Sequence, residues 1–575
     1  MHPAIDERAT VMVPQIIVCG LGRTGFRIFS LLQEQGIQVV GISDRALPEA
    51  GDGIPIVVGD VRREEILLAA GIREAQTLLL AGADDALNLA VMTQARLLNP
   101  KIRVVNRLFN ERLGERLDHT LSDHISMSVS ALVAPIFAFA ALGNRAIGQL
   151  RLFHRSWPIE EIYITADHPW CGLPIRQLWV NPTRMLLAYE AAAWPGSLME
   201  AVAMERVLEP GDRLLISNRP GWRRPRRSLR QRWRGLAGGL LQFRRQSRAF
   251  LLVTLALMLT IGAATLTYLS SSTGISAVDA LYFSVGMITG AGGQEQVAEN
   301  AAPAVKVFTA VMMLVGAGVI GICYALLNDF ILGTHLQQIW TAARVPSTGH
   351  HIVCGLGGVG MRIGEQLSLL GEDLVAIEYD PNSRFLGAAR ARRVPLLVAD
   401  ASVPETLRLA NIHRARSLLA VTSDDTVNLE IAITARSLAP RLPVLVRIHD
   451  PRFAQQIKQV FDFDMVMSPT GLAAPAFAAT AIGGRVFGSC LTAGGLWIAI
   501  ATLITPNHPF CDRILSDVAI RERFTPLYAE FQENRIHGQA LLDYRLGNGT
   551  VLYLMMPAHQ WEQIWSHASQ SLRAL

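Results

Sequence analysis

The chain of 575 residues has few cysteines and no cysteine pair at the spacing of a disulfide framework or a thiol redox motif. Its six cysteines are scattered, and no CxxC occurs. This pattern excludes a small disulfide-stapled secreted domain and favours a reducing compartment. The stretch MHPAIDERATVMVPQ also lacks the apolar core of a signal peptide, so we expect no cleaved leader.

Charge is scarce as well. Only 18% of the residues are charged, 50% are hydrophobic, and the mean hydropathy is +0.28. These values are high for a purely soluble protein and low for a polytopic transporter. They predict three or four domains in which soluble units are combined with a few membrane helices.

Acidic residues are absent from positions 213 to 278, whereas ten arginines lie between 222 and 248. A nucleic-acid-binding segment is one interpretation of such a run. The run ends where an apolar segment begins, which favours a linker on the cytoplasmic flank of a membrane helix. We therefore expect a cytoplasmic linker over 221–248 and no nucleic-acid partner.

Two segments lack charge altogether, 250–270 and 307–327, and each has 21 residues. That length spans a bilayer. The loop between them carries Asp279, Glu295 and Glu299 against Lys306. The positive-inside rule then places both termini in the cytoplasm, with a multi-pass chain in the cell membrane and lipid as a partner.

The two ends of the chain are copies of each other. IIVCGLGRTGFRIFSLLQEQGIQVVGIS from residue 16 aligns with HIVCGLGGVGMRIGEQLSLLGEDLVAIE from residue 351. The glycines are 335 residues apart, and the offset then holds at 340 for a long distance. One domain of about 200 residues is therefore duplicated. The apolar stretch 488–506 has a charged counterpart at 148–166, so we expect strands there and no membrane helix. The 14 residues of 129–142 are too short to span.

Each copy has a GxGxxG turn between an apolar strand and a helix. The turn glycines are Gly20, Gly22 and Gly25 in the first copy and Gly355, Gly357 and Gly360 in the second. Such a turn allows backbone N–H groups at a helix N-terminus to approach a phosphate. Two copies in register predict nucleotide-binding Rossmann-like folds. A degenerate fold that serves only as scaffold is the alternative for either copy.

The second strand of such a fold ends in an acid that holds a ribose hydroxyl. Glu378 has this position in the second copy, 23 residues after Gly355. The first copy has Ser43 at that distance, and Asp44 follows one residue later, where a strand side chain points the other way. The first copy also has Arg23 inside its turn, which suits a charged phosphate chain.

The series GLGRTG…VVGD…AGI…GADDALNLA…VVNRL and its twin GLGGVG…LVADAS…ANI…TSDDTVNLE…VLVRI resemble the RCK (TrkA-type) regulatory domains of potassium channels and transporters. The resemblance covers most of both soluble halves and points to the RCK-regulated two-transmembrane potassium channel family. It implies that Asp60 and Asp400 lie near the adenosine side of the ligand. It also implies that Arg107 and Arg447 lie near the cleft. Ligands reported for the family are NAD(H), ATP, ADP and AMP, with calcium or another regulatory divalent cation in some members.

These arguments predict α/β Rossmann-like RCK domains in two copies that flank an all-α, two-helix transmembrane pore module. The expected domains are N-lobes at 14–143 and 349–483, C-lobes at 144–220 and 484–575, and a pore module at 249–340 with its pore loop at 276–297. The expected cofactor-binding residues are Gly20, Gly22, Arg23, Thr24, Gly25, Ser43, Asp44, Asp60, Arg107, Gly355, Gly357, Gly358, Val359, Gly360, Glu378, Asp400 and Arg447.

His168 with Cys171, and His508 with Cys511, are the candidate metal-ligand pairs. Two ligands per site are too few to hold a metal without partners. We therefore interpret both pairs as packing residues at a turn and expect no metal site.

The pore loop departs from a potassium filter, which stacks carbonyl rings from TVGYG. Residues 276–289 read as a pore helix, and Thr289 matches the threonine before that motif. The residues that follow it are Gly290, Ala291, Gly292, Gly293, Gln294 and Glu295. We expect a less selective filter with an acidic ring at Glu295, loosely similar to that of CASTOR/POLLUX channels. Three glycines of the second span, Gly316, Gly318 and Gly321, allow either a hinge or close packing.

The sequence thus predicts a nucleotide-regulated cation channel for K⁺ or Na⁺, a homotetramer gated by an eight-lobed RCK ring. The alternative is a non-conducting, membrane-anchored nucleotide or redox sensor that regulates a partner transporter. No catalytic constellation accompanies the glycine turns, so we do not expect an enzyme.

Overall fold

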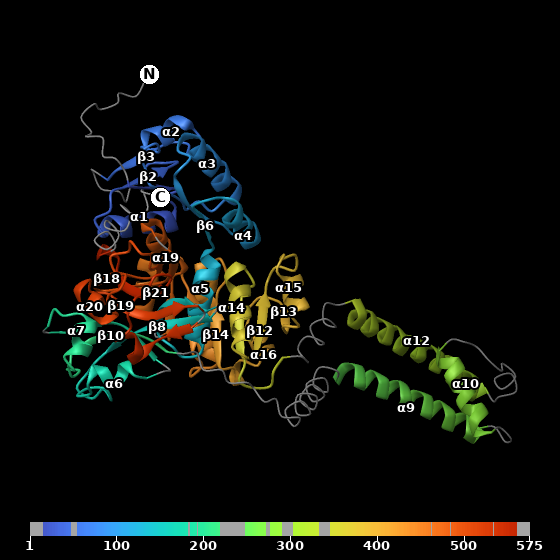
Figure 1. Ribbon diagram of the computed structural model, residues 1–575. Coiled ribbons are helices and arrows are strands. Elements are labelled where there is room, and N and C mark those ends of the chain that lie inside the picture. The colour runs from blue at the N-terminus through green and yellow to red at the C-terminus, as the bar shows by residue number, and fades with distance from the viewer. Residues whose placement is uncertain are drawn as a thin grey trace.

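The computed structural model describes residues 15–47, 54–153, 155–181, 184–192, 194–218, 248–271, 276–289, 303–332, 345–461, 463–483, 485–532 and 534–560. These residues form two six-stranded sheets, one nine-stranded sheet and a helical hairpin (Figure 1).

The first parallel sheet has the strand order β3-β2-β1-β4-β5-β6. Its strands are β1 (Ile16–Cys19), β2 (Val39–Ser43), β3 (Ile56–Val58), β4 (Thr77–Leu80), β5 (Arg103–Arg107) and β6 (His124–Met127). The helices of this unit are α1 (Arg23–Glu34), α2 (Glu64–Ala69), α3 (Asp85–Leu98) and α4 (Glu111–Thr120). All four residues of β1 are buried, because helices cover both faces of a parallel sheet. The order reverses between β1 and β4, which places a crevice at the carboxyl ends of these strands.

The second parallel sheet repeats this order as β13-β12-β11-β14-β15-β16. Its strands are β11 (His351–Cys354), β12 (Leu374–Glu378), β13 (Leu396–Val398), β14 (Ser417–Ala420), β15 (Val444–Arg447) and β16 (Met465–Met467). Its helices are α14 (Gly358–Leu369), α15 (Leu386–Ala391), α16 (Pro404–Leu409), η1 (Ile412–Arg414), α17 (Asp425–Leu438) and α18 (Pro451–Val460). The predicted pair of Rossmann-like units is confirmed.

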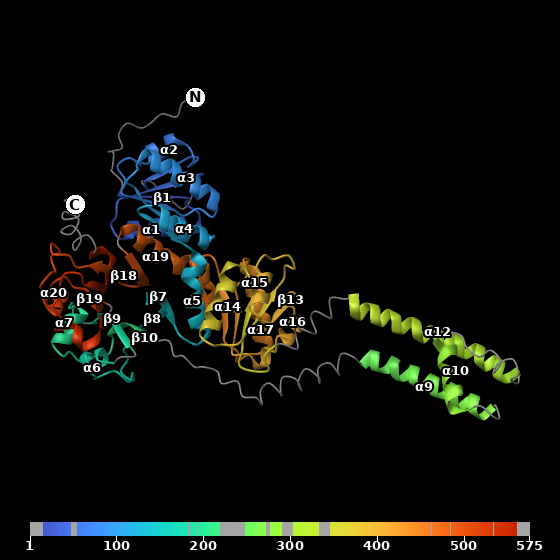
Figure 2. The ribbon, with the colours of Figure 1, turned by 45° about the vertical axis from the view of Figure 1, so that its right-hand side comes forward.

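The two units exchange helices. Helix α5 (Val129–Ala141) of the first copy packs against α14 of the second, and α19 (Pro469–Ile482) packs against α1 of the first (Figures 1 and 2). Both exchanged helices are apolar on all sides, and such helices are stable only when they are surrounded. Phe137 and Phe477 are fully buried in one core, which also holds Phe29 of α1 and Ile363 of α14.

Proline interrupts both exchanged helices. Pro135 has no N–H group, so it cannot bond to the carbonyl of Ala131 one turn earlier. Arg151 Nη2 donates to that carbonyl at 2.7 Å, and Gln149 Nε2 donates to the neighbouring carbonyl of Leu132 at 2.8 Å. The strand that follows α5 therefore satisfies the backbone that the proline leaves open.

The smaller lobes of both copies form one sheet with the order β20-β19-β21-β18-β17-β7-β8-β10-β9. Its strands are β7 (Ala146–Leu152), β8 (Arg155–Tyr163), β9 (Arg184–Glu190), β10 (Arg213–Asn218), β17 (Arg485–Thr492), β18 (Gly495–Leu503), β19 (Thr525–Phe531), β20 (Asn534–Ile536) and β21 (Val551–Pro557). Short helices α6 (Ile175–Trp179), α7 (Leu198–Ala203), α20 (Leu515–Arg521), η2 (Gly538–Leu541) and η3 (Ala558–Gln560) complete the lobes. Strands β17 and β18 confirm that 488–506 is not a membrane helix.

Strands β7 and β17 join the copies. Gly148 pairs with Cys490, and Gly488 pairs with Leu150. A Cβ atom added to Gly148 would lie 2.4 Å from the carbonyl oxygen of Ser489, and one added to Gly488 would lie 2.5 Å from Leu150 Cδ2. Both glycines are therefore required by the close approach of the two strands.

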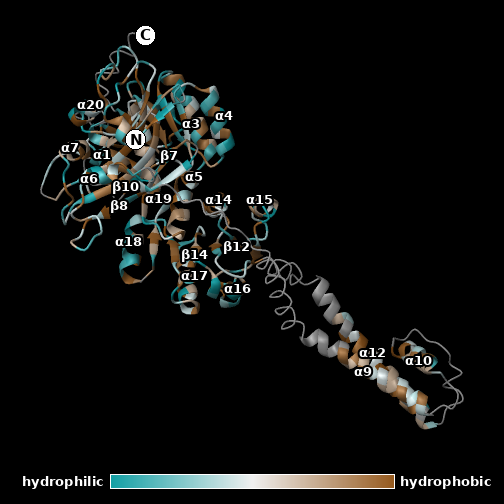
Figure 3. Cartoon of the chain, turned by 60° about the horizontal axis from the view of Figure 1, so that its bottom comes forward, coloured by the Kyte–Doolittle hydropathy of each residue, from teal (hydrophilic) through white to brown (hydrophobic). Residues whose placement is uncertain are grey.

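The remaining helices form a hairpin: α9 (Arg248–Ser271), α10 (Ala277–Thr289) and α12 (Pro303–Leu332). The hydroxyls of Tyr268 and Thr309 lie 2.8 Å apart between α9 and α12. Phe283 of α10 packs edge-on against Tyr268. Apolar residues dominate the coloured parts of these helices in Figure 3. No helix within the described residues is both long enough and apolar enough to cross a membrane.

Only some of the predicted pore residues lie within the described part of this hairpin. Helix α10 covers the predicted pore helix and ends at Thr289, whereas residues 290–295 lie outside the described residues. A Cβ atom on Gly316 would lie 2.9 Å from the backbone of Ile288, so this glycine allows α12 to pack on α10. Among described atoms, nothing lies within 4 Å of a Cβ placed on Gly318 or Gly321.

We expect Gly148→Ala to destabilise the protein by about 1 to 3 kcal/mol, because the added methyl group forces β7 away from β17. The control is Gly387→Ala in α15, where a Cβ atom meets nothing among the described residues. The free energy of unfolding in urea measures both effects. Equal stability of the two variants would contradict the tight seam between the lobes.

Candidate functional site

The crevices of the two Rossmann-like units open into one cavity of about 1430 Å³. This volume exceeds the usual size of a pocket for one small ligand. The predicted residues that line it are Gly20, Gly22, Arg23, Thr24, Asp44, Arg107, Gly355, Gly357, Gly358, Val359, Glu378, Asp400 and Arg447. Four predicted residues do not line it: Gly25, Ser43, Asp60 and Gly360.

The outer glycines of each turn are required by the fold. Gly20 and Gly355 have φ of +83° and +96°, in the left-handed region that favours glycine. A Cβ atom on Gly25 would lie 2.1 Å from the carbonyl oxygen of Gly20, and one on Gly360 would lie 1.9 Å from that of Gly355. The first glycine makes the turn, and the third allows the helix to pack against it.

The middle glycines are different. Gly22 and Gly357 have φ of −69° and −74°, which any residue adopts. Among described atoms, nothing lies within 4 Å of a Cβ built on either residue. Both are N-cap residues, of α1 and α14, and neither helix start is capped by a side chain. The backbone therefore does not require glycine at these two positions. What a glycine provides here is open space above the N-terminus of each helix. A phosphate group fits such a place.

The acid at the second strand is present in one copy only. Glu378 Oε2 accepts from the N–H of Leu356 at 2.6 Å, and Oε1 accepts from the N–H of Asp380 at 3.0 Å. The carboxylate is thereby fixed beside the glycine turn. Ser43 has the same register in the first sheet, where it is buried, and its Oγ accepts from the N–H of Arg45 at 3.3 Å. Asp44 lines the cavity one residue further on.

The acids that follow the third strands also differ. Asp60 accepts three side-chain hydrogen bonds from Nε and Nη2 of Arg62, the shortest at 2.8 Å, and these bonds lower its pKa to about 2. It does not line the cavity, so the expected position of Asp60 beside a ligand is not seen. Asp400 accepts from the N–H and the hydroxyl of Ser402 at 2.9 and 2.8 Å, and it does line the cavity.

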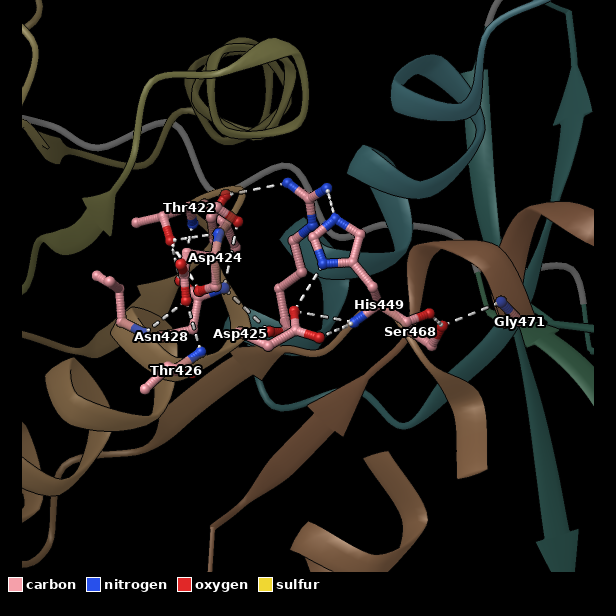
Figure 4. A network of polar contacts seen from close by, with 11 residues as sticks. Thr422, Asp424, Asp425, Thr426, Asn428, His449, Ser468 and Gly471 are labelled. Carbon is pink, nitrogen blue, oxygen red and sulfur yellow. Dashed lines mark hydrogen bonds and ion pairs between the residues drawn. The ribbon is translucent and has the colours of Figure 1, made fainter. Parts of the chain in front are cut away.

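Arg107 and Arg447 have equivalent positions at the ends of β5 and β15. Their guanidinium groups donate to the carbonyls of Ala81 and Val421 at 3.0 and 3.2 Å. Burial lowers the pKa of both side chains. In the second copy, Asn428 fixes the backbone of this region by donating to the carbonyl of Arg447 at 3.0 Å (Figure 4).

His449 was not predicted from the sequence. Its Nδ1 lies 2.6 Å from Asp425, and its Nε2 lies 2.8 Å from Arg447 Nη2 (Figure 4). Since a guanidinium only donates, Nε2 accepts and Nδ1 carries the proton. The first copy has Phe109 at this position, with the Arg107 guanidinium 5.3 Å from its ring centre. The only indication in the sequence was that His449 follows Arg447, a predicted cleft residue, by two positions.

The helix exchange brings residues of one copy to the turn of the other. Ser130, in the first turn of α5, has its Oγ 3.7 Å from the place of a Cβ on Gly358. Thr470 of α19 also lines the cavity. Neither residue was predicted, because the alignment of the copies does not reveal which helix packs on which sheet.

The two candidate metal pairs serve as turn residues. Nδ1 of His168 accepts from the N–H of Trp170, and Nδ1 of His508 accepts from the N–H of Phe510, both at 3.2 Å. Within the described ranges, no three His, Cys, Asp or Glu side chains are grouped so that they could hold a metal ion.

Comparison with known proteins gives two matches to the model of the TrkA-N domain, at residues 16–128 and 351–469. The chain is 26% identical over 204 residues to "Probable potassium channel protein 2" of Methanocaldococcus jannaschii, which covers 34% of this chain and 58% of that protein. It is 23% identical over 222 residues to "Potassium channel protein 1" of the same organism, which covers 37% and 66%. The matched regions thus span less than two thirds of these relatives.

Among solved structures, the "Crystal Structure of the GsuK RCK domain" aligns with a TM-score of 0.46 and 12% identity, over 98% of this chain and 96% of that one. The "GsuK channel bound to NAD" aligns with a TM-score of 0.45 and 13% identity, over 98% and 80%. Both TM-scores are below 0.5, so neither alignment identifies the function of this chain. The two matched regions coincide with the two parallel sheets and their glycine turns, so each six-stranded unit is similar to a TrkA-N domain, and the chain is similar to potassium channel proteins over about a third of its length.

Proposed function

We propose that the glycine turns bind adenine nucleotides or dinucleotides, a class that includes NAD(H), ATP, ADP and AMP, and that binding regulates a cation pathway formed by the helix hairpin. The observation that carries the nucleotide proposal is the open space above Gly22 and Gly357. It lies at uncapped helix N-termini, where backbone N–H groups and the helix dipole favour an anion.

The second cleft offers a complete set of contacts for such a ligand. A phosphate group would lie at the N-terminus of α14, and Glu378 would accept from a ribose hydroxyl. Each carboxylate oxygen of Glu378 accepts one backbone hydrogen bond, which leaves a lone pair on each for the ribose. Asp400 and His449 line the same cavity.

The hairpin is proposed as a two-helix membrane module with the loop outside and both termini in the cytoplasm. Its support is the absence of charge from 250–270 and 307–327, together with the outward-facing apolar side chains of the hairpin. Leu259, Leu266 and Leu314 are 66%, 69% and 80% exposed. An apolar surface of this kind indicates contact with lipid or with other helices.

Four chains would close a pore for K⁺ or Na⁺, and their eight TrkA-N domains would form a ring on the cytoplasmic side. The first copy connects to the N-terminus of α9 and the second copy to the C-terminus of α12, because residues 218 and 248 flank one link and residues 332 and 345 flank the other. A ligand that binds two shapes of the paired domains with different affinity would thereby shift the pore between two states. We propose a regulatory role for the nucleotide and no catalysis.

We expect Gly357→Ala to leave the unliganded protein intact and to remove nucleotide binding at the second cleft. The added methyl group meets no described atom but fills the space for the phosphate. Differential scanning fluorimetry with NAD⁺, NADH, ATP, ADP and AMP measures both properties. We expect the wild-type melting temperature without ligand and a smaller ligand-induced rise.

The matched control is Gly360→Ala, whose methyl group would collide with the carbonyl oxygen of Gly355. This variant should lose about 1 to 3 kcal/mol of stability even without ligand. If Gly357→Ala binds every nucleotide as well as the wild type, the phosphate site is not at this turn.

Cation flux into proteoliposomes tests the pore. We expect K⁺ or Na⁺ flux that changes with the bound nucleotide, and a lower flux for Glu295→Gln, because the substitution removes an acidic ring. Nucleotide binding without any flux would contradict the channel proposal and would favour the alternative, a membrane-anchored sensor that regulates a partner transporter.

A further inference from the structure

The two clefts share one backbone geometry but differ in charge where the second strand ends. Ser43 pairs with Val58, and Glu378 pairs with Val398, at the same register of the two sheets. The preceding residues match as well, since Ile42 pairs with Cys19 and Ile377 pairs with Cys354. A neutral serine in the first copy therefore occupies the position of the Glu378 carboxylate in the second copy.

The next difference lies two residues further along. Arg45 and Asp380 occupy equivalent positions, and each donates its backbone N–H to the side chain at the strand end, at 3.3 and 3.0 Å. The turn is thus retained, while an acid is replaced by a cation. Both Arg45 and Asp380 line the cavity.

The acid that follows the third strand is also less negative in its surroundings in the first copy than in the second. Asp400 of the second copy is bonded to Ser402, a neutral partner. Its counterpart Asp60 is paired with Arg62, which stands where Ser402 stands and neutralises the acid. At two equivalent positions, the strand end and the turn after it, the first copy lacks an acid that the second copy keeps, and its acid after the third strand, Asp60, is paired with Arg62 outside the cavity. Asp44 also lines the cavity, but it aligns with Tyr379, so its carboxylate lies one register position away from that of Glu378.

The end of the second strand and the turn after it lie beside the ribose of a nucleotide bound to a Rossmann-like fold. An acid at the strand end accepts from the free 2′-hydroxyl and repels a 2′-phosphate, whereas a nearby arginine accommodates that phosphate. Arginine binds phosphate through paired, charge-assisted hydrogen bonds. The replacement of Glu378 and Asp380 by Ser43 and Arg45 therefore exchanges one preference for the other.

We propose that the two clefts of one chain take different nucleotides: the first takes an adenine dinucleotide with a 2′-phosphate, the NADP(H) class, and the second takes one with a free 2′-hydroxyl, the NAD(H) class. This rests on the proposed nucleotide binding. The duplicated chain then responds to two ligands in one cavity, and the difference between the copies gives each cleft its own ligand class.

Adenosine 2′,5′-bisphosphate and AMP differ only in the 2′-phosphate, so a comparison of their binding measures the contribution of that group. Isothermal titration calorimetry of the full chain should give one site per chain for each probe. Saturation with one probe should leave the site for the other open. Arg45→Asp should weaken the bisphosphate by about tenfold or more and leave AMP unchanged. Arg45 is exposed, so an unaltered melting temperature without ligand provides the folding control.

The reciprocal variant is Glu378→Ser combined with Asp380→Arg, which should add a second bisphosphate site and remove the AMP site. Competition of both probes for the same sites, or an unchanged bisphosphate affinity of Arg45→Asp, would overturn the assignment. AMP binding at two equal sites without bisphosphate binding would also overturn it, while the proposed nucleotide function would stand. Failure of both probes and of the intact dinucleotides to bind would overturn both.

Discussion

Two helices that are apolar on every side hold the two copies together. An amphipathic helix is satisfied by one sheet, whereas α5 and α19 need a second surface, and each finds it on the other copy. The exchange places Phe137 and Phe477 in a shared core and brings β7 beside β17, so that both smaller lobes form one sheet. The rest of the two α/β units depends on this constraint, because the copies cannot separate without exposing that core.

The constraint also creates the site. Since each exchanged helix begins beside the opposite glycine turn, the two crevices face a common cavity, and Ser130 lies close to Gly358. Ligands in one crevice therefore lie beside structure contributed by the other copy. A change of spacing between the units would be transmitted to both links with the helix hairpin, and this is the physical basis of the proposed regulation.

The sequence predicted the parts of this structure that local patterns encode. Strand, glycine turn and helix were evident from HIVCGLGGVG and its twin, and the charged counterpart of 488–506 identified strands β17 and β18. The helix exchange could not be predicted, because an apolar pattern reveals that α5 is buried but not which surface covers it. The same holds for Asp60, whose pairing with Arg62 depends on side-chain geometry, and for His449, which acquires its place from contacts with Asp425 and Arg447.

In both copies, the middle glycine of the turn leaves room for a phosphate at the helix N-terminus. An electron cryomicroscopy map of the chain with bound NAD⁺ would show whether a phosphate occupies this space. We expect phosphate density above Gly357, within hydrogen-bonding distance of the first N–H groups of α14, with the ribose beside Glu378. Nucleotide density elsewhere in the molecule, with both glycine turns empty, would contradict it.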